Sequence, residues 1–271
     1  MTLAVDLSGR TILVCGVARG GIGGATARQL ARAGATVIGL DKELALIEAT
    51  RADVEALGGT LHPLVVDLMD VAQCESVIAT IIERFGRIDG IANVAGGTRD
   101  SEWMPLDETP GESFWATFQL NLAYIFYLCR DVAKHWIDSG RQGAIVNVSS
   151  VSSLASAPWH GPYGAAKSGI TALTRTMANE WHEFGIRANC VLPGAVMTER
   201  VRVRMPPDNV ITNSEQNFTE PEELANAIVF LLSDLASGIS GQSLTVDRSL
   251  STKFCAGARR SRKSLAAAPP A

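Results

Sequence analysis

The sequence lacks the features of a membrane-spanning or secreted protein. No apolar run among its residues approaches the ~18 residues that a membrane-spanning helix requires. The first ten residues, MTLAVDLSGR, contain no basic stretch followed by an apolar one, which a secretion signal would need. The five cysteines are scattered, and none forms a C-x-x-C pair, which is typical of reduced thiols. We therefore expect a cytoplasmic protein with no membrane partner.

The sequence also has little that would bind a metal or nucleic acid. Its four histidines show no ligand spacing, so we predict no metal site. The formal net charge is −4, and five of the cations lie in the last nineteen residues, where no acid occurs. The rest of the chain is therefore more acidic still, which argues against general nucleic-acid binding, because that needs a basic face.

Enough apolar material is present for one large folded domain. Hydrophobic residues make up 46% of the 271 residues and charged residues 19%, as in compact soluble proteins. Short β-branched apolar runs alternate with segments of helical spacing, which predicts a parallel sheet wound on both faces. We expect an α/β fold, a single Rossmann-like doubly wound domain over residues 1–252, with a mostly or wholly parallel seven-stranded sheet flanked by helices.

The alternation gives approximate positions for the elements. The expected strands cover residues 11–15, 35–40, 61–66, 88–94, 144–148, 187–192 and 243–246. The expected helices cover residues 25–35, 42–57, 71–85, 112–139, 163–184 and 221–232. Residues 196–219 break this rhythm and predict a mobile lid over a substrate. Residues 253–271 predict a disordered basic tail, with docking on an acidic surface as the alternative.

A glycine-rich loop follows the first expected strand and leads into the first helix. Gly16, Gly21 and Gly23 would let the backbone approach a pyrophosphate, which the N-terminal amides of the helix would hold. An ordinary strand-to-helix turn is the alternative. Asp41 ends the second strand, where a carboxylate can accept the ribose hydroxyls of NAD and repel the 2′-phosphate of NADP. We therefore favour NAD, although Lys42 or Arg19 could neutralise that phosphate.

Further candidates for cofactor contact lie at the ends of the next two strands. In doubly wound sheets, ligands bind outside the carboxyl ends of the strands. Asp67, Asn93, Ala95 and Gly96 each follow or end such a strand. Helix capping by Asp67 and simple turn formation at residues 95–97 are the alternatives.

Tyr163 and Lys167 form the candidate acid and base. They lie four residues apart on an expected helix, so both side chains reach the same place. A lysine ammonium near a phenol favours the phenolate and can lower the pKa of the tyrosine. Asn121 is a polar residue within an apolar helical stretch and needs a hydrogen-bond partner. An exposed, inert Tyr-Lys pair and a satisfied core amide are the alternatives.

Together these motifs resemble the classical short-chain dehydrogenase/reductase family over about residues 6–250. The motifs are CGVARGGIG, VVDLMD, NVAG at 93–96, NLAYIF, NVSS at 147–150, YGAAK at 163–167 and PGAVMT at 193–198. The resemblance implies that Asn121, Ser150, Tyr163 and Lys167 are the catalytic set. Ser150 is preferred to Ser149 because the family's serine usually stands thirteen residues before the tyrosine.

The resemblance also implies the remaining roles. Ser150 and Tyr163 would hold the substrate oxygen, Lys167 would bind the nicotinamide ribose, and Asn121 would anchor a water that relays the proton. The implied cofactor-binding residues are Gly16, Arg19, Gly21, Ile22, Gly23, Asp41, Asp67, Leu68, Asn93, Ala95, Gly96, Tyr163, Lys167, Pro193, Val196 and Thr198. The sequence departs from the family at Cys15, at one extra residue before Gly21, at Val94 and at Arg248-Ser249, none of which removes a catalytic group.

The substrate is expected to be a small secondary alcohol or ketone. Beside Ser150, the side chains of Trp103, Met104, Trp159 and Met197 could form an apolar, adaptable wall, which favours a hydrophobic cyclic, aromatic or steroid-like compound. An NADPH-dependent carbonyl or 3-oxoacyl reductase is the alternative, and a non-catalytic dinucleotide-binding protein is a further one. The apolar stretch around Asn121 suggests a second subunit, so we expect a homo-oligomer, either a dimer or a tetramer.

Overall fold

The protein is described by a computed structural model over residues 4–98, 103–204 and 218–252. Within these ranges seven strands form one wholly parallel sheet in the order β3-β2-β1-β4-β5-β6-β7, which confirms the expected fold. The strands are β1 (Thr11–Cys15), β2 (Thr36–Asp41), β3 (Thr60–Val65), β4 (Gly90–Asn93), β5 (Gly143–Val148), β6 (Ile186–Pro193) and β7 (Ser243–Val246). The strand order reverses between β1 and β4, and ligands bind at such a point.

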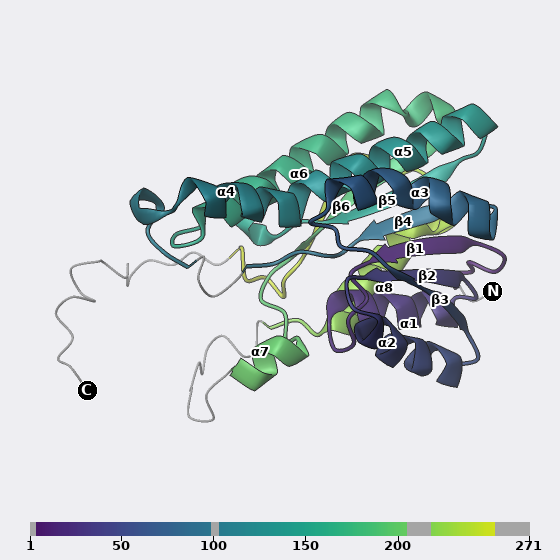
Figure 1. Ribbon diagram of the computed structural model, residues 1–271, viewed down its shortest axis with the longest axis horizontal. Helices are drawn as coiled ribbons and strands as arrows, with labels where there is room; N and C mark the ends of the chain where they lie inside the picture. The colour runs from purple at the N-terminus through teal and green to yellow at the C-terminus, as the bar shows by residue number, and fades with distance from the viewer. Residues whose placement is uncertain (1–3, 99–102, 205–217, 253–271) are drawn as a thin grey trace.

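Helices cover both faces of the sheet. The helices are α1 (Ile22–Arg32), α2 (Leu44–Ala56), α3 (Val71–Phe85), α4 (Gly111–Phe118), α5 (Tyr124–Ser139), α6 (Gly161–Glu180), α7 (Glu199–Arg204) and α8 (Pro221–Leu232). Figure 1 shows α3, α5 and α6 on one side of the strands and α1, α2 and α8 on the other. Both faces of the central strands are therefore covered.

The core follows from the alternation of side chains along each strand. In β1, Leu13 packs into the cluster that includes the buried residues of α3 and α5. Its neighbour Val14 packs into the cluster that includes those of α1 and α8. Because successive side chains of a strand point to opposite faces, a strand covered on both faces must be apolar throughout. This explains why all five residues of β1 are buried.

Helix α3 begins and ends where the sequence predicts. The Asp70 carboxylate accepts hydrogen bonds from the amides of Ala72 (2.9 Å) and Gln73 (3.3 Å), and Gly86 ends the helix at a φ of 75°. Asp70 therefore caps α3. Asp67 instead accepts from the amide of Met69 at 2.9 Å, so helix capping does not explain its presence.

The long helix expected over residues 112–139 is interrupted. A π turn at Gln119–Ala123 separates α4 from α5. In a π turn the hydrogen-bonding partner shifts from the fourth to the fifth residue, and such turns are frequent at functional sites. The interruption places Asn121 inside the turn.

Other boundaries differ from the expectation by a few residues. Helix α6 ends at Glu180, and a 3-10 turn follows at His182–Phe184. Strand β6 includes Pro193 as its last residue, so the missing N–H interrupts the ladder only where the strand ends. The segment expected as a lid contains the short helix α7. Its residues 205–217, and the predicted tail at 253–271, lie outside the described residues, so the domain boundary at 252 stays a prediction.

Two further properties hold for the residues that the structure describes. No helix among them combines the length and the apolar character that crossing a membrane requires. No three histidine, cysteine or acidic side chains in that part of the chain are grouped so that they could hold a metal ion. The four cysteines there, Cys15, Cys74, Cys129 and Cys190, are buried and free, and Cys255 lies outside the described ranges.

Candidate active site

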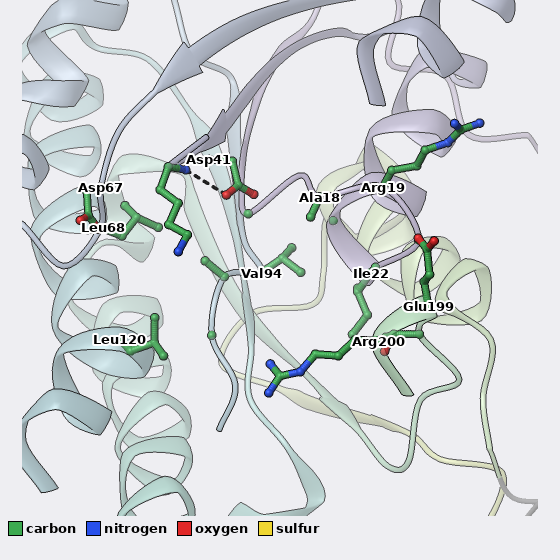
Figure 2. Close-up of a pocket in the computed structure, with 18 of the residues that line it drawn as sticks. Ala18, Arg19, Ile22, Asp41, Asp67, Leu68, Val94, Leu120, Glu199 and Arg200 are labelled. Atoms are coloured by element: carbon green, nitrogen blue, oxygen red, sulfur yellow. Dashed lines mark hydrogen bonds between the residues drawn. The ribbon is translucent and has the colours of Figure 1, made fainter. Parts of the chain in front are cut away.

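A cavity of about 920 Å³ lies at the carboxyl ends of the strands, within the range of small-molecule and cofactor sites. Its walls come from the glycine loop, the ends of β2, β3 and β4, the π turn and α7 (Figure 2). The expected cofactor residues that line it are Gly16, Arg19, Gly21, Ile22, Gly23, Asp41, Asp67, Leu68, Ala95, Gly96 and Thr198. The structure thus gathers most of that set around one space.

The glycine loop needs its glycines. Gly16 has a φ of 87°, and a Cβ atom there would lie 2.8 Å from the backbone of Ala95. A Cβ on Gly23 would overlap the carbonyl of Gly16. Helix α1 starts at Ile22 with Gly21 as its N-cap, and no side chain caps its first amides. Those free N–H groups suit an anion, so the loop fits the pyrophosphate of a dinucleotide.

Asp41 lines the same cavity, beside the glycine loop. Burial raises the pKa of its carboxyl group, while hydrogen bonds from the amides of Lys42, Ala18 and Val17 oppose that rise. These amides hold the carboxylate beside the glycine loop, and Figure 2 marks the hydrogen bond of 2.9 Å that it accepts from the Lys42 amide. Asp41 is therefore a fixed acceptor at the place where the sequence predicts the adenosine ribose.

Arg19 is turned away from Asp41. Its guanidinium pairs with the Asp53 carboxylate of α2 at 2.7 Å, and Figure 2 shows its side chain pointing out of the cavity. Arg28 of α1 also contacts Asp53, at 3.4 Å. Arg19, one of the two cations that could neutralise a 2′-phosphate, is therefore already paired with the Asp53 carboxylate.

Lys167 is buried and bound to the end of β5. Its Nζ donates to the carbonyl oxygen of Val148 at 3.0 Å and lies 5.5 Å from the centroid of the Tyr163 ring. Burial lowers the pKa of Lys167 to about 8. A Cβ atom on Gly96 would lie 3.3 Å from this Nζ, so Lys167 reaches the edge of the cavity.

The two candidate oxygens, on Tyr163 and Ser150, face each other. Burial raises the pKa of Tyr163, and a hydrogen bond with the Ser150 side chain opposes the rise. The lowering of the tyrosine pKa that the sequence suggests is not seen, because burial outweighs the hydrogen bond and Lys167 is turned toward Val148. Ser149 points elsewhere, donating to the carbonyl of Lys167 at 2.7 Å. This geometry favours Ser150 over Ser149 at the site.

Asn121 ties the π turn to the end of β4. Its Nδ2 donates to the carbonyls of Gly97 and Thr117, both at 3.0 Å, and its Oδ1 accepts from the Gly97 amide at 2.9 Å. The side-chain amide of Asn121 thus bonds through both its nitrogen and its oxygen, and the residue is buried. A Cβ on Gly96 would lie 2.6 Å from Oδ1. Asn121 therefore lies beside Gly96, close to Lys167.

Five expected cofactor residues do not line the cavity. Two of them are Tyr163 and Lys167 of α6, and three lie elsewhere. Asn93 is buried and donates to Asn147 at 2.8 Å, while its Oδ1 has no partner in the described part of the chain. Pro193 is buried at the end of β6. Val196 forms a bridge with Thr219. The asparagine pair links β4 to β5 below the site.

The expected substrate residues fall into two groups. Trp103 and Trp159 belong to segments joined by a hydrogen bond of 2.8 Å from the Met104 amide to the Trp159 carbonyl. Met197 is tied to Thr219 by a backbone bond of 2.8 Å. None of the three lines the large cavity.

Ten residues of the cavity wall are absent from the expected cofactor-binding set. These are Ala18, Gly20, Lys42, Val66, Met69, Val94, Leu120, Glu199, Arg200 and Val203. Glu199 donates its amide to the carbonyl of Gly20 at 3.1 Å, and Arg200 donates to the carbonyl of Thr98 at 2.7 Å. The three arginines of Glu199–Arg204 were the available signal that this segment contacts an anion.

Known proteins share this architecture along nearly the whole chain. A family model described as enoyl-(acyl carrier protein) reductase matches residues 16–250. A 3-oxoacyl-[acyl-carrier-protein] reductase from Thermotoga maritima is 34% identical, over 90% of this chain and 98% of that protein. A 2,5-dichloro-2,5-cyclohexadiene-1,4-diol dehydrogenase from Sphingobium indicum is 35% identical, over 89% and 97%.

A solved structure agrees with the sequence matches. The structure of a gluconate 5-dehydrogenase from Burkholderia cenocepacia in complex with NADP and tartrate has a TM-score of 0.83 and 30% identity, covering 92% of this chain and 98% of that one. The matched region includes the glycine loop, the Asn121 turn and the Tyr163-Lys167 helix. The chain therefore belongs to the classical short-chain dehydrogenase/reductase family of NAD(P)-dependent oxidoreductases.

Proposed function

We propose that this protein transfers hydride between NAD and a secondary alcohol or its ketone at Tyr163. The observation that carries the proposal is the meeting of Tyr163, Ser150 and Lys167 at the edge of a dinucleotide-sized cavity. Gly96 lines that cavity and lies against both Asn121 and Lys167. The acid/base group and the cofactor space are therefore contiguous.

The roles of the side chains follow from their contacts. Ser150 and Tyr163 hold the substrate oxygen. During oxidation the phenolic oxygen of Tyr163 takes the alcohol proton as its own proton passes to the relay beside Lys167, and during reduction both transfers run in reverse. Lys167, whose pKa burial lowers to about 8, can carry a positive charge or release a proton near neutral pH. Asn121 anchors the turn whose backbone binds the relaying water. A bound nicotinamide supplies the hydride acceptor in oxidation and the hydride donor in reduction.

The cavity would hold the dinucleotide. The glycine loop and the first amides of α1 would hold its pyrophosphate, Asp41 the adenosine ribose, and Lys167 the nicotinamide ribose. Asp67, Leu68 and Ala95 line its path, and Thr198 closes it from the side of α7.

NAD is the preferred cofactor because the two cations considered for a 2′-phosphate already face acids. Arg19 is paired with Asp53, and Lys42 lies 3.6 Å from Glu43. We predict that Asp41→Ser lowers kcat/KM with NAD and raises it with NADP, each by roughly tenfold, the effect of ~1.4 kcal/mol. Separate titrations of the two cofactors check this. A wild-type preference for NADP would contradict the assignment.

The substrate is a hydrophobic secondary alcohol or ketone, with a cyclic, aromatic or steroid-like body. The exposed rings of Trp103 and Trp159, close to the helix that carries Tyr163, support this choice. The test is a screen of such alcohols with NAD, and of their ketones with NADH, followed at the nicotinamide absorbance. Turnover of none of them with either dinucleotide would overturn the proposal.

An NADPH-dependent 3-oxoacyl reductase is the second candidate. The likeness to the Thermotoga maritima 3-oxoacyl-[acyl-carrier-protein] reductase favours it. Reduction of acetoacetyl thioesters with NADPH, faster than oxidation of any cyclic alcohol with NAD, would establish it instead.

We also propose that the protein is a cytoplasmic homo-oligomer, a dimer or a tetramer. The side chains of Trp115 on α4 and Phe126 on α5 are 69% and 45% exposed, although both are large and apolar. Such a face is typical of a subunit interface.

A further inference from the structure

A row of three aromatic rings ends at the candidate catalytic tyrosine. The rings of Trp103 and His160 are 4.4 Å apart between centroids, inclined at 31°. The rings of His160 and Tyr163 are 5.7 Å apart, inclined at 40°. The row therefore joins a tryptophan from the segment before α4 to the candidate catalytic tyrosine through one imidazole.

The row is held in place at Trp103 and next to His160. The Trp103 indole donates to the Thr98 hydroxyl at 3.1 Å, and the Met104 amide donates to the Trp159 carbonyl at 2.8 Å. Trp159 has a φ of 70°, a left-handed conformation that is rare for a bulky residue and costs about 1–3 kcal/mol. Such strain is concentrated at sites where the geometry is used.

The hydrogen bond of His160 fixes its tautomer. Nδ1 lies 2.9 Å from the carbonyl oxygen of Pro158. Because a carbonyl only accepts, Nδ1 must carry the hydrogen, and in the neutral ring Nε2 is then a lone-pair acceptor. Nε2 makes no hydrogen bond to any residue that the structure describes.

Helix geometry places His160 on the substrate side of Tyr163. His160 is the N-cap of α6, three residues before Tyr163, while Lys167 is four residues after it. The Tyr163 ring therefore lies between His160 and Lys167 along the helix. The Lys167 side borders the cofactor cavity through Gly96, which leaves the His160 side for the substrate.

We propose that the Trp103–His160–Tyr163 row selects cyclic diols, in which one hydroxyl reacts at Tyr163 and a neighbouring hydroxyl donates to Nε2 of His160. The inference rests on the proposed dehydrogenase function and specifies its substrate class. Because the centroids of the His160 and Tyr163 rings lie 5.7 Å apart, a substrate built on one carbon ring is large enough to contact both residues. Trp103, which is 53% exposed, offers an apolar face to the carbon ring.

The test compares cyclohexane-1,2-diol with cyclohexanol as substrates, with NAD as the acceptor. We expect the wild type to have the higher kcat/KM for the diol. His160→Phe keeps an aromatic ring in the row and removes the acceptor. It should lower the ratio of the two kcat/KM values about tenfold or more, because a site built to hydrogen-bond a hydroxyl then loses its partner. His182→Phe, at an exposed histidine beyond the end of α6, is the matched control and should leave the ratio unchanged.

Binding of NADH, followed by its fluorescence, and the melting temperature show whether His160→Phe is folded. If it misfolds, His160→Gln tests the same point, because its amide can still offer an oxygen to the hydroxyl. The His160→Gln variant should then retain more of the ratio than His160→Ala, and equal ratios in these two variants would overturn the role of His160.

Each outcome has a distinct meaning. An unchanged ratio in a folded His160→Phe overturns the role of His160, and a wild type that oxidises other alcohols but not the diol overturns the substrate class. The proposed function survives both results. Turnover of no alcohol in the wider screen overturns the proposed function itself.

Discussion

At the scale of single residues, Lys167 combines a charge with almost complete burial. It is 3% exposed, and apart from the Val148 carbonyl little compensates for the lost hydration. Burial therefore lowers the pKa of Lys167 from 10.5 to about 8. The buried ammonium of Lys167 lowers the stability of the fold, as is usual for a residue that serves activity.

This cost can be measured as a function of pH. Below pH 8 the lysine is protonated in both states, and its burial destabilises the fold by roughly 3 kcal/mol. Between pH 8 and 10.5 the unfolded chain binds the extra proton, so stability rises with pH. We predict that Lys167→Met raises the free energy of unfolding most below pH 8, and that the gain shrinks as the pH rises toward 10.5.

Urea unfolding of both proteins at several pH values checks this prediction. Lys134→Met, at an exposed position paired with Asp138, is the matched control and should show a change of only about 0–1 kcal/mol. A gain that is absent at neutral pH, or that grows with pH, would contradict the burial of a charged Lys167.

At the scale of elements, the π turn between α4 and α5 connects the helix layer to the end of β4. The side chain of Asn121 makes three hydrogen bonds, two of them with Gly97 and one with the Thr117 carbonyl. Since each such bond contributes about 1 kcal/mol, Asn121→Ala should lower the free energy of unfolding by roughly 2–3 kcal/mol. Hydrogen exchange at the Gly97 amide should also accelerate.

Thermal melting and hydrogen exchange measure these two effects. Gln119→Ala, in the same turn, removes only a long contact of 3.4 Å to the Leu68 carbonyl and is the matched control. Equal losses in the two variants would show that the turn, and not the Asn121 amide, determines the stability.

The elements also show where prediction from sequence succeeds. The positions of Gly16, Asp41 and Gly96 near one edge of the sheet could be predicted. The end of an apolar run marks the end of a strand, and parallel strands bring those ends together. The π turn at Asn121 could not be placed, because the sequence of α4 and α5 is helical throughout, whereas the bonds of Asn121 with Gly97 join residues 24 positions apart. The Trp103–His160 contact joins residues far apart in the chain, so no local pattern contains it.

At the scale of the whole molecule, the exposed aromatic face of α4 and α5 predicts the assembly. We predict that Trp115→Glu converts the oligomer to monomers, because a carboxylate in an apolar interface loses its hydration without gaining a partner. Light scattering after size-exclusion chromatography measures this. Leu57→Glu, at a leucine 42% exposed beyond the end of α2, is the control. A wild type that is monomeric would contradict the proposed interface.

The central claim is that the phenolic oxygen of Tyr163 exchanges a proton with the substrate. Removal of that one oxygen atom tests the claim. Tyr163→Phe removes the phenolic oxygen and keeps the ring, whereas Tyr127→Phe makes the same change on α5, where the ring contacts Arg130 at 5.5 Å. With an alcohol found in the screen and saturating NAD, we predict that Tyr163→Phe loses kcat by a factor on the order of 10²–10⁴, with NADH binding retained. Tyr127→Phe should match the wild type. A Tyr163→Phe protein that binds NADH and turns over at the wild-type rate would contradict the account.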